Sequence, residues 1–262
     1  MTPGAHTALV VIGSALVVVG AARSTWSPCG RSMLSSINPV GEAGRGRRFG
    51  PTAAWFVAGA VAGGACLGAA LAVLAAGVHR LGGGGAAAAT PPAVSGAVAV
   101  VLLAALALDA GRLGPPPPYL RRQVNEVWLD RYRPWVYGAG FGWQIGVGFA
   151  TFVMTAALGG LVLVAAATGS PLVAWSLGTA FGAARGLTVL TAAQARTPAD
   201  LALAQRRLDR VERPVRMAVL AVLAGGAVLA GALAWWPAGV AAAAAALLVA
   251  GRRRRVGVAP AT

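Results

Sequence analysis

The chain has 262 residues, of which 57% are hydrophobic and 11% charged, and its mean hydropathy is +0.70. A soluble domain cannot hide that much apolar surface in a core, so the composition predicts a membrane protein. The net charge of +15 comes from 22 arginines, with no lysine. These arginines lie between long apolar blocks, where they set topology and attract anionic lipid headgroups, so we expect a lipid bilayer and no nucleic acid as partner.

The same composition excludes several kinds of site. Two cysteines give neither a disulfide scaffold nor a zinc site, and His6 and His79 stand alone, so we expect no metal and no cofactor. There is no P-loop, HExxH or nucleophile elbow, which argues against a soluble enzyme. The first apolar run lacks a basic n-region, so we expect it to be retained rather than cleaved as a signal peptide.

Seven apolar blocks could cross a hydrocarbon core of about 30 Å. In chain order they are Thr7 to about Ala22, continuing toward Asn38; Pro51 to Val78; Ala93 to Gly111; about Trp135 to Ala167; Pro171 to Ala193; Met217 to Trp236; and Pro237 to Gly251. The seventh block would make a helix of only ~22 Å, so it needs snorkelling arginines or a thinned bilayer.

The charges of the links alternate. The segments after the first, third, fifth and seventh blocks are rich in arginine, whereas the link after the second has only Arg80 and those near Gly169 and Pro237 have no charge. Because arginine-rich loops stay in the cytoplasm, this pattern predicts an inner-membrane protein with its N-terminus outside and its C-terminus in the cytoplasm.

Three links have a recognisable character. "TPADLALAQRRLDRVERP" has Thr197 as a candidate N-cap and Pro198 at the first helical position, which predicts a short interfacial helix. "PPPPYLRRQVNEVWLDRYRPW" begins as polyproline II and becomes amphipathic. "LGGGGAAAATPP" is typical of a flexible linker.

The second and fifth blocks resemble each other, since Trp55 matches Trp175 and, after a one-residue gap, Gly63 matches Gly182. Three spans separate the copies, so the second copy enters the membrane from the opposite side. We therefore expect an all-α polytopic bundle forming one transmembrane domain over residues 1–262. It has two inverted three-helix repeats, about 7–111 and about 135–236, and an extra span at 237–251. Chance similarity between two alanine-rich segments is the alternative.

The first span of each repeat looks broken, at Ser27-Pro28-Cys29-Gly30 and in "YGAGFGWQIGVGFATFVMT". Inverted-repeat proteins place their working site near mid-membrane where such broken helices meet, so we expect the centre there. The alternative for the glycines is small-xxx-small packing between helices. It applies to Gly138, Gly142 and Gly146, and equally to Gly178, Gly182 and Gly186.

Arg185 is the one arginine well inside a predicted span. A charge there costs at least ~2.5 kcal/mol, so it should face a cavity, a partner or a substrate. Alternatively it snorkels to the cytoplasmic end or pairs with Asp109. Other polar candidates for the substrate path are Ser32, Gln144, Thr151 and Thr155, beside Pro28; hydrogen bonding between helices is the alternative for each.

"SPCGRSMLSSINP" resembles the transmembrane domain family of CcdA and DsbD, within the wider superfamily that includes LysE-type exporters and urease-accessory-like membrane proteins. The resemblance rests on Ser27, Pro28 and Cys29 and on the span arrangement. It implies six core spans in two inverted triplets, each with a Pro-Cys break in its first span. It also implies a role in carrying reducing equivalents from cytoplasmic thioredoxin outward, with Cys29 as the redox residue.

The sequence departs from that family at two places. No cysteine follows Cys66, and Ser32 stands where the family has a proline. A disulfide needs Cα atoms about 4.4–6.8 Å apart. Cys66 is the candidate partner of Cys29 within the chain, and a thiol of another protein is the other candidate. Alternatively, each cysteine is only a small buried residue, Cys66 in a tight helix contact and Cys29 at the helix break.

Three classes of function remain open. The chain could move reducing equivalents by thiol chemistry with thioredoxin-like partners, as in cytochrome c biogenesis. It could instead transport a small, possibly anionic solute with Arg185 at the site. A scaffold or assembly factor without transport is the third class.

Overall fold

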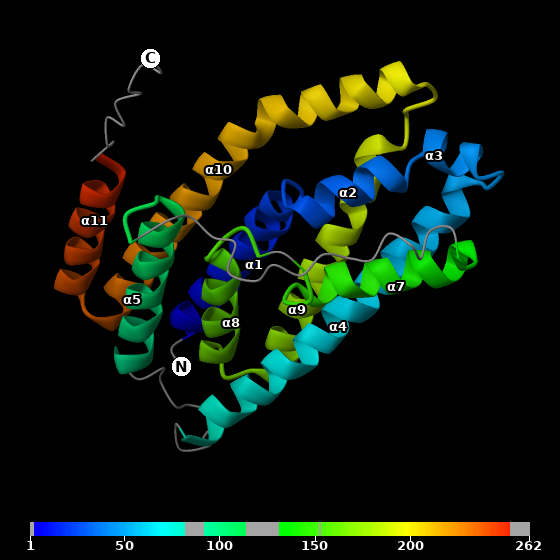
Figure 1. Cartoon of the computed structure of the whole chain (residues 1–262). Helices are drawn as coiled ribbons and strands as arrows, with labels where there is room; N and C mark the ends of the chain where they lie inside the picture. The colour runs from blue at the N-terminus through cyan, green and yellow to red at the C-terminus, as the bar shows by residue number, and fades with distance from the viewer. Residues whose placement is uncertain (1–2, 82–91, 114–130, 152, 252–262) are drawn as a thin grey trace, which may run out of the picture.

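The computed structural model describes residues 3–81, 92–113, 131–151 and 153–251, and within these ranges all regular structure is helical (Figure 1). The elements are α1 (Pro3–Ser24), α2 (Pro28–Ser36), α3 (Pro39–Gly44), α4 (Phe49–Leu81), α5 (Pro92–Asp109), α7 (Pro134–Val147), α8 (Ala157–Ala167), α9 (Pro171–Leu187), the 3-10 helix η1 (Thr188–Ala192), α10 (Pro198–Ala234) and α11 (Trp236–Gly251). The all-α class predicted from the sequence is confirmed for these residues. The polyproline stretch, the glycine-rich linker and the arginines of the C-terminal tail lie outside them.

Four of the described helices are long and apolar enough to cross a bilayer, namely α1, α4, α5 and α10. The helices α8 and α11 are apolar but shorter. The chain is therefore a membrane protein with several apolar helices. The fourth predicted span, Trp135 to Ala167, is divided between α7 and α8 rather than continuous.

The helix α10 differs from the prediction. We expected a short interfacial helix followed by a separate span from Met217, but one helix runs from Pro198 to Ala234 with Pro214 inside it. Proline removes one backbone donor and bends a helix without necessarily ending it, and Figure 1 shows α10 curving between its arginine-rich beginning and its apolar end. The predicted start is confirmed, since Thr197 and Asp200 form a capping box.

Glycines bring the central helices together. The helix α4 packs along both α7 and α9. A methyl group added to Gly142 would collide with the backbone of Phe56, and one added to Gly182 would collide with that of Gly64. The glycines of α7 and α9 that the sequence marked as packing faces are thus in close backbone contact with α4.

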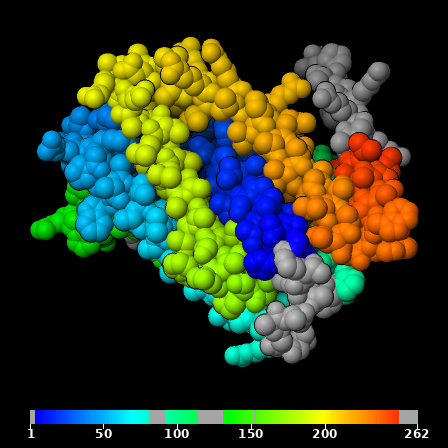
Figure 2. All heavy atoms as spheres, turned by 180° about the vertical axis from the view of Figure 1, so that it is seen from behind, coloured from blue at the N-terminus to red at the C-terminus, as the bar shows by residue number. Residues whose placement is uncertain are grey.

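The remaining long helices enclose α1. The helix α1 contacts α8, α9 and α10, and α5 packs against α10 and α11. Figure 2 shows α1 as a strip between α9 and α10 on this face of the molecule. Buried leucine, valine and alanine side chains of these helices form one apolar core.

The arginine-rich segments that the structure describes lie towards one end of the helical body. In Figure 1, α3, the end of α5 and the beginning of α10 are at the same end, whereas the α8–α9 and α10–α11 turns are at the opposite end. This arrangement agrees with the alternation of charged and uncharged links in the sequence. Which end faces the cytoplasm stays a prediction.

Candidate functional site

The first helix break separates α1 from α2. The side chain of Ser27 accepts a hydrogen bond from the Gly30 amide at 3.0 Å, and Pro28 occupies the first position of α2. A methyl group on Gly30 would lie 2.5 Å from the Thr25 carbonyl oxygen, so the chain reverses too tightly for a larger residue. The sequence therefore ends α1 and starts α2 with three local features: Ser27 as the cap, Pro28 at the first helical position, and Gly30 at the close backbone contact.

The second break separates α7 from α8. The helix α7 ends at Gly148, whose φ of 80° suits glycine. At the start of α8, the Asp109 carboxylate accepts hydrogen bonds from the Ala156 amide at 2.9 Å and from the Thr155 hydroxyl. A carboxylate at a helix N-terminus satisfies free N–H groups and opposes the positive end of the helix dipole. Asp109, from α5, thus caps α8.

Arg185 of α9 contacts the C-terminal end of α7, on the other side of the same break. Its side chain is 3% exposed and donates to the Ile145 carbonyl at 2.6 Å and to the Thr151 hydroxyl at 3.3 Å. Ile145 lies in the last turn of α7, at the negative end of the helix dipole, and its carbonyl also accepts a hydrogen bond from the Gly148 amide at 3.2 Å. Arg185 is buried and does not snorkel. In the described structure Asp109 does not pair with Arg185 but caps the start of α8.

Cys29 lies where this arrangement meets the first break. It is the second residue of α2 and its side chain is 2% exposed. Its sulfur is close enough to Arg185 for the two groups to interact electrostatically. The structure therefore brings together three of the residues chosen from the sequence, Cys29, Thr151 and Arg185, at the predicted meeting point of two broken helices.

The other chosen residues are placed elsewhere. Cys66 is exposed on α4, and both cysteines are free, so Cys66 neither bonds to Cys29 nor sits in a tight helix contact. Thr155 belongs to the α8 cap with Asp109. Pro28 is exposed at the start of α2, Ser32 is half-buried in α2, and Gln144 is half-buried next to Ile145.

Glu42 was not singled out from the sequence, yet it is fully buried. The Tyr137 hydroxyl is 2.7 Å from each of its carboxylate oxygens, the Thr52 hydroxyl donates at 2.8 Å, and Arg45 forms an ion pair at 3.3 Å. These contacts join α3, α4 and α7. One signal was available, because Glu42 is the single acidic residue among the first 108.

The chemistry available at the two breaks comes from one thiol, one guanidinium, the Asp109 carboxylate, threonine hydroxyls and the polar ends of helices. Among the residues that the structure describes, no three histidine, cysteine or acidic side chains gather as metal ligands would. A thiolate is the nucleophilic form of cysteine, and it is favoured by a helix N-terminus and by a nearby cation. Cys29 is the second residue of α2 and interacts electrostatically with Arg185.

Comparison with known proteins gives two informative similarities. The chain is 34% identical over 185 residues to the methylamine utilization protein MauF of Paracoccus denitrificans, covering 68% of this chain and 62% of that protein. It is 31% identical over 165 residues to MauF of Methylophilus methylotrophus, covering 59% of this chain and 52% of that protein. The chain thus spans between half and two thirds of the length of these relatives. No family model and no solved structure matches it.

Proposed function

We propose that this membrane protein performs thiol–disulfide exchange through Cys29, as an accessory to methylamine utilization, the process for which its two relatives are named. The observation that carries the proposal is the placement of Cys29 at the N-terminus of α2 within electrostatic reach of Arg185. Arg185 supplies the positive charge that a thiolate needs as a neighbour in an apolar interior.

The exchange starts with attack of the Cys29 thiolate on a disulfide of a partner protein. A new S–S bond forms between Cys29 and one partner sulfur, and the other partner sulfur leaves as a thiolate with the bonding electron pair. Ser27 caps α2 and Pro28 is its first residue. We expect these two residues to hold the Cys29 sulfur at the start of α2 during both exchange steps.

The mixed disulfide is resolved by a thioredoxin-like dithiol. Its first thiolate attacks the Cys29 sulfur and releases the partner's second thiolate, and its second thiolate then closes the dithiol's own disulfide and frees Cys29. In sum, one dithiol is oxidised, one partner disulfide is reduced, and Cys29 returns to its starting state. This scheme needs no second cysteine in the chain, which agrees with the exposed, unbonded Cys66.

The architecture supports the proposal in a second way. The pairs α4 with α9 and α5 with α10 are in contact, and each predicted repeat begins with a broken helix, α1–α2 or α7–α8. These are the contacts expected of two inverted three-helix repeats, the arrangement that the resemblance to CcdA and DsbD implies. Under this proposal the missing second-half cysteine is replaced by Arg185, which approaches Cys29 from the second repeat.

One observation favours a second candidate, transport of a small anionic solute. The Nε–H of Arg185 is buried and has no hydrogen-bond partner among the described residues. An unsatisfied donor inside a membrane protein is costly, and an anion passing between the two breaks would satisfy it. In this case Cys29 has a packing role only.

Growth separates the two candidates. A Paracoccus denitrificans strain without its own MauF would be supplied with this chain and tested for growth on methylamine. The thiol proposal predicts that wild type and Cys66→Ser restore growth, whereas Cys29→Ser does not, even when its amount in the membrane matches wild type. Arg185→Gln is expected to slow growth, because it removes the charge beside the thiolate.

The growth test can also contradict the thiol chemistry and the role in methylamine utilization separately. Growth restored by Cys29→Ser but lost in both Arg185→Gln and Arg185→Lys would support the solute candidate. Failure of wild type to restore growth, with the protein present in the membrane, would contradict the role in methylamine utilization.

A further inference from the structure

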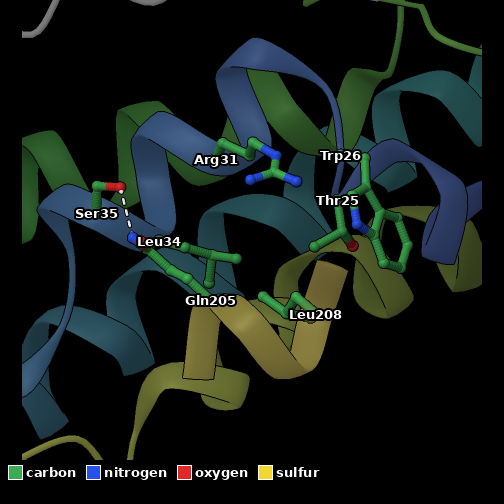
Figure 3. A pocket seen from close by; sticks show the side chains of 7 residues that line it. All are labelled: Thr25, Trp26, Arg31, Leu34, Ser35, Gln205 and Leu208. Atoms are coloured by element: carbon green, nitrogen blue, oxygen red, sulfur yellow. Dashed lines mark hydrogen bonds between the residues drawn. The ribbon is translucent and has the colours of Figure 1, made fainter. Parts of the chain in front are cut away.

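A cavity of about 150 Å³ lies between the α1–α2 break and α10. Figure 3 shows its lining side chains converging from the two elements, with Thr25, Trp26, Arg31, Leu34 and Ser35 on one side and Gln205 and Leu208 on the other. Thr25, Trp26 and Leu34 are buried at its base, and Arg31 and Ser35 are exposed at its rim. The volume accommodates several water molecules or one compact polar group.

The base of the cavity carries an unsatisfied donor. The indole N–H of Trp26 is buried, with the residue 8% exposed, and has no hydrogen-bond partner among the described residues. Buried indole N–H groups normally find an acceptor, because leaving one unpaired costs about 1–3 kcal/mol. The rim adds further donors, since Ser35 and Arg31 both carry O–H or N–H groups.

The charges around the cavity favour an anion. Arg31 is paired with Asp209, and Arg23, just before the break, is paired with Glu212 at 3.0 Å. Four more arginines stand on the same stretch of α10 (Arg206, Arg207, Arg210 and Arg213), so the two segments that form the cavity carry six arginines against the two carboxylates of Asp209 and Glu212. This stretch directly precedes the apolar part of α10, at the level where phospholipid headgroups lie beside a spanning helix.

We propose that the cavity between the α1–α2 break and α10 binds a phosphate oxyanion, with the Trp26 N–H as its innermost donor. The rim donors of Ser35 and Arg31 contact the outer oxygens, and Leu34 and Leu208 supply the apolar part of the wall, against which the ester carbons of a lipid would pack. The group comes either from an anionic phospholipid or from a free phosphate. Binding fixes α10 against the break that carries Cys29, whether or not Cys29 exchanges disulfides.

The test uses the full chain in detergent and counts bound ligand by native mass spectrometry. Dioctanoyl phosphatidylglycerol is titrated beside dioctanoylglycerol, which lacks the phosphate, and inorganic phosphate is added as a competitor. We expect phosphatidylglycerol to bind and dioctanoylglycerol not to. Competition by inorganic phosphate identifies a free oxyanion as sufficient, and absence of competition identifies the lipid as the ligand.

Three variants test whether phosphatidylglycerol binds in this cavity. Trp26→Phe keeps the ring and removes the donor, so it should weaken phosphatidylglycerol binding about tenfold, whereas Trp175→Phe, an exposed tryptophan of α9, should leave it unchanged. Leu208→Trp fills the cavity from α10 while leaving residue 26 unchanged and should abolish binding. Equal binding by wild type, Trp26→Phe and Leu208→Trp would overturn the proposal, as would equal binding of dioctanoylglycerol.

Discussion

Three ionisable side chains inside the helical body are each held by hydrogen bonds with groups on neighbouring helices. Arg185 contacts a carbonyl at the end of α7, Asp109 caps the start of α8, and Glu42 receives hydrogen bonds from Tyr137 and Thr52. An isolated charge in an apolar interior is very costly, whereas a hydrogen-bonded one is tolerated. The broken helices and the buried charges therefore stabilise each other.

The Glu42 contacts give a prediction about stability. Tyr137→Phe removes the hydroxyl that lies 2.7 Å from both carboxylate oxygens, and loss of a hydrogen bond to a buried charged group should cost about 1.5–3 kcal/mol. Thermal unfolding in detergent measures the change. Tyr132→Phe is the comparison variant, because Tyr132 is 43% exposed. A Tyr137→Phe protein that unfolds at the wild-type temperature would show that the Tyr137 hydroxyl contributes nothing.

At the scale of elements, the helices fall into two kinds. The helices α4, α7 and α9 meet through glycines, so their backbones are in contact, whereas α1, α5, α8 and α10 meet through leucine and valine side chains. Close backbone contact in a membrane gains packing and weak hydrogen bonds that lipid cannot offer. Arg185 is on α9 and its acceptor Ile145 is on α7, so α4 sets the distance between them.

Two glycines of α4, one in a helix contact and one in open space, allow a matched test of this packing. A methyl group on Gly64 would lie 2.7 Å from the Gly178 carbonyl oxygen, whereas one on Gly77 would meet nothing within 4 Å. Gly64→Ala should destabilise the protein by about 1–3 kcal/mol through overpacking. Gly77→Ala should be neutral or stabilising by up to about 1 kcal/mol, because alanine favours the helix. A Gly64→Ala protein that unfolds at the wild-type temperature would contradict the described contact of α4 with α9.

Helix breaks and packing faces could be predicted from the sequence, but the partners of the charges could not. Ser-Pro-Cys-Gly and the glycine-rich run after Trp135 are local signals, and the structure has a break in each. The contact of Arg185 with Ile145 joins residues 40 positions apart, and no local pattern encodes it. The continuity of α10 through Pro214 was not predicted either, because a proline inside a helix bends it without necessarily ending it, and the local sequence does not show which of the two occurs.

At the scale of the whole molecule, composition alone predicted a membrane protein, since 57% of the residues are hydrophobic. The structure agrees, because four described helices are long and apolar enough to span a bilayer. The count of seven spans and the sidedness rest on the arginine pattern. They stay predictions, because α7, α8, α9 and α11 are too short for length alone to decide whether each crosses the bilayer.

Accessibility to an impermeant maleimide tests the sidedness. In a Cys29→Ser, Cys66→Ser background, Trp235→Cys places a thiol at the exposed α10–α11 junction, and Gln194→Cys places one before the start of α10. The arginine pattern predicts labelling of the first in intact cells and of the second only after permeabilisation. Labelling of both from the same side would mean that α10 does not cross the membrane.

The most direct test of the central claim is to trap the mixed disulfide at Cys29. A thioredoxin-like protein whose second active-site cysteine is replaced by serine would be incubated with membranes in which Cys29 is held in a mixed disulfide with its partner protein, and adducts would be separated under non-reducing conditions. We predict a covalent adduct with wild type and with Cys66→Ser that disappears on reduction, and none with Cys29→Ser. An adduct that persists in Cys29→Ser, or none with the Cys66→Ser chain, would contradict thiol exchange at the meeting point of the two broken helices.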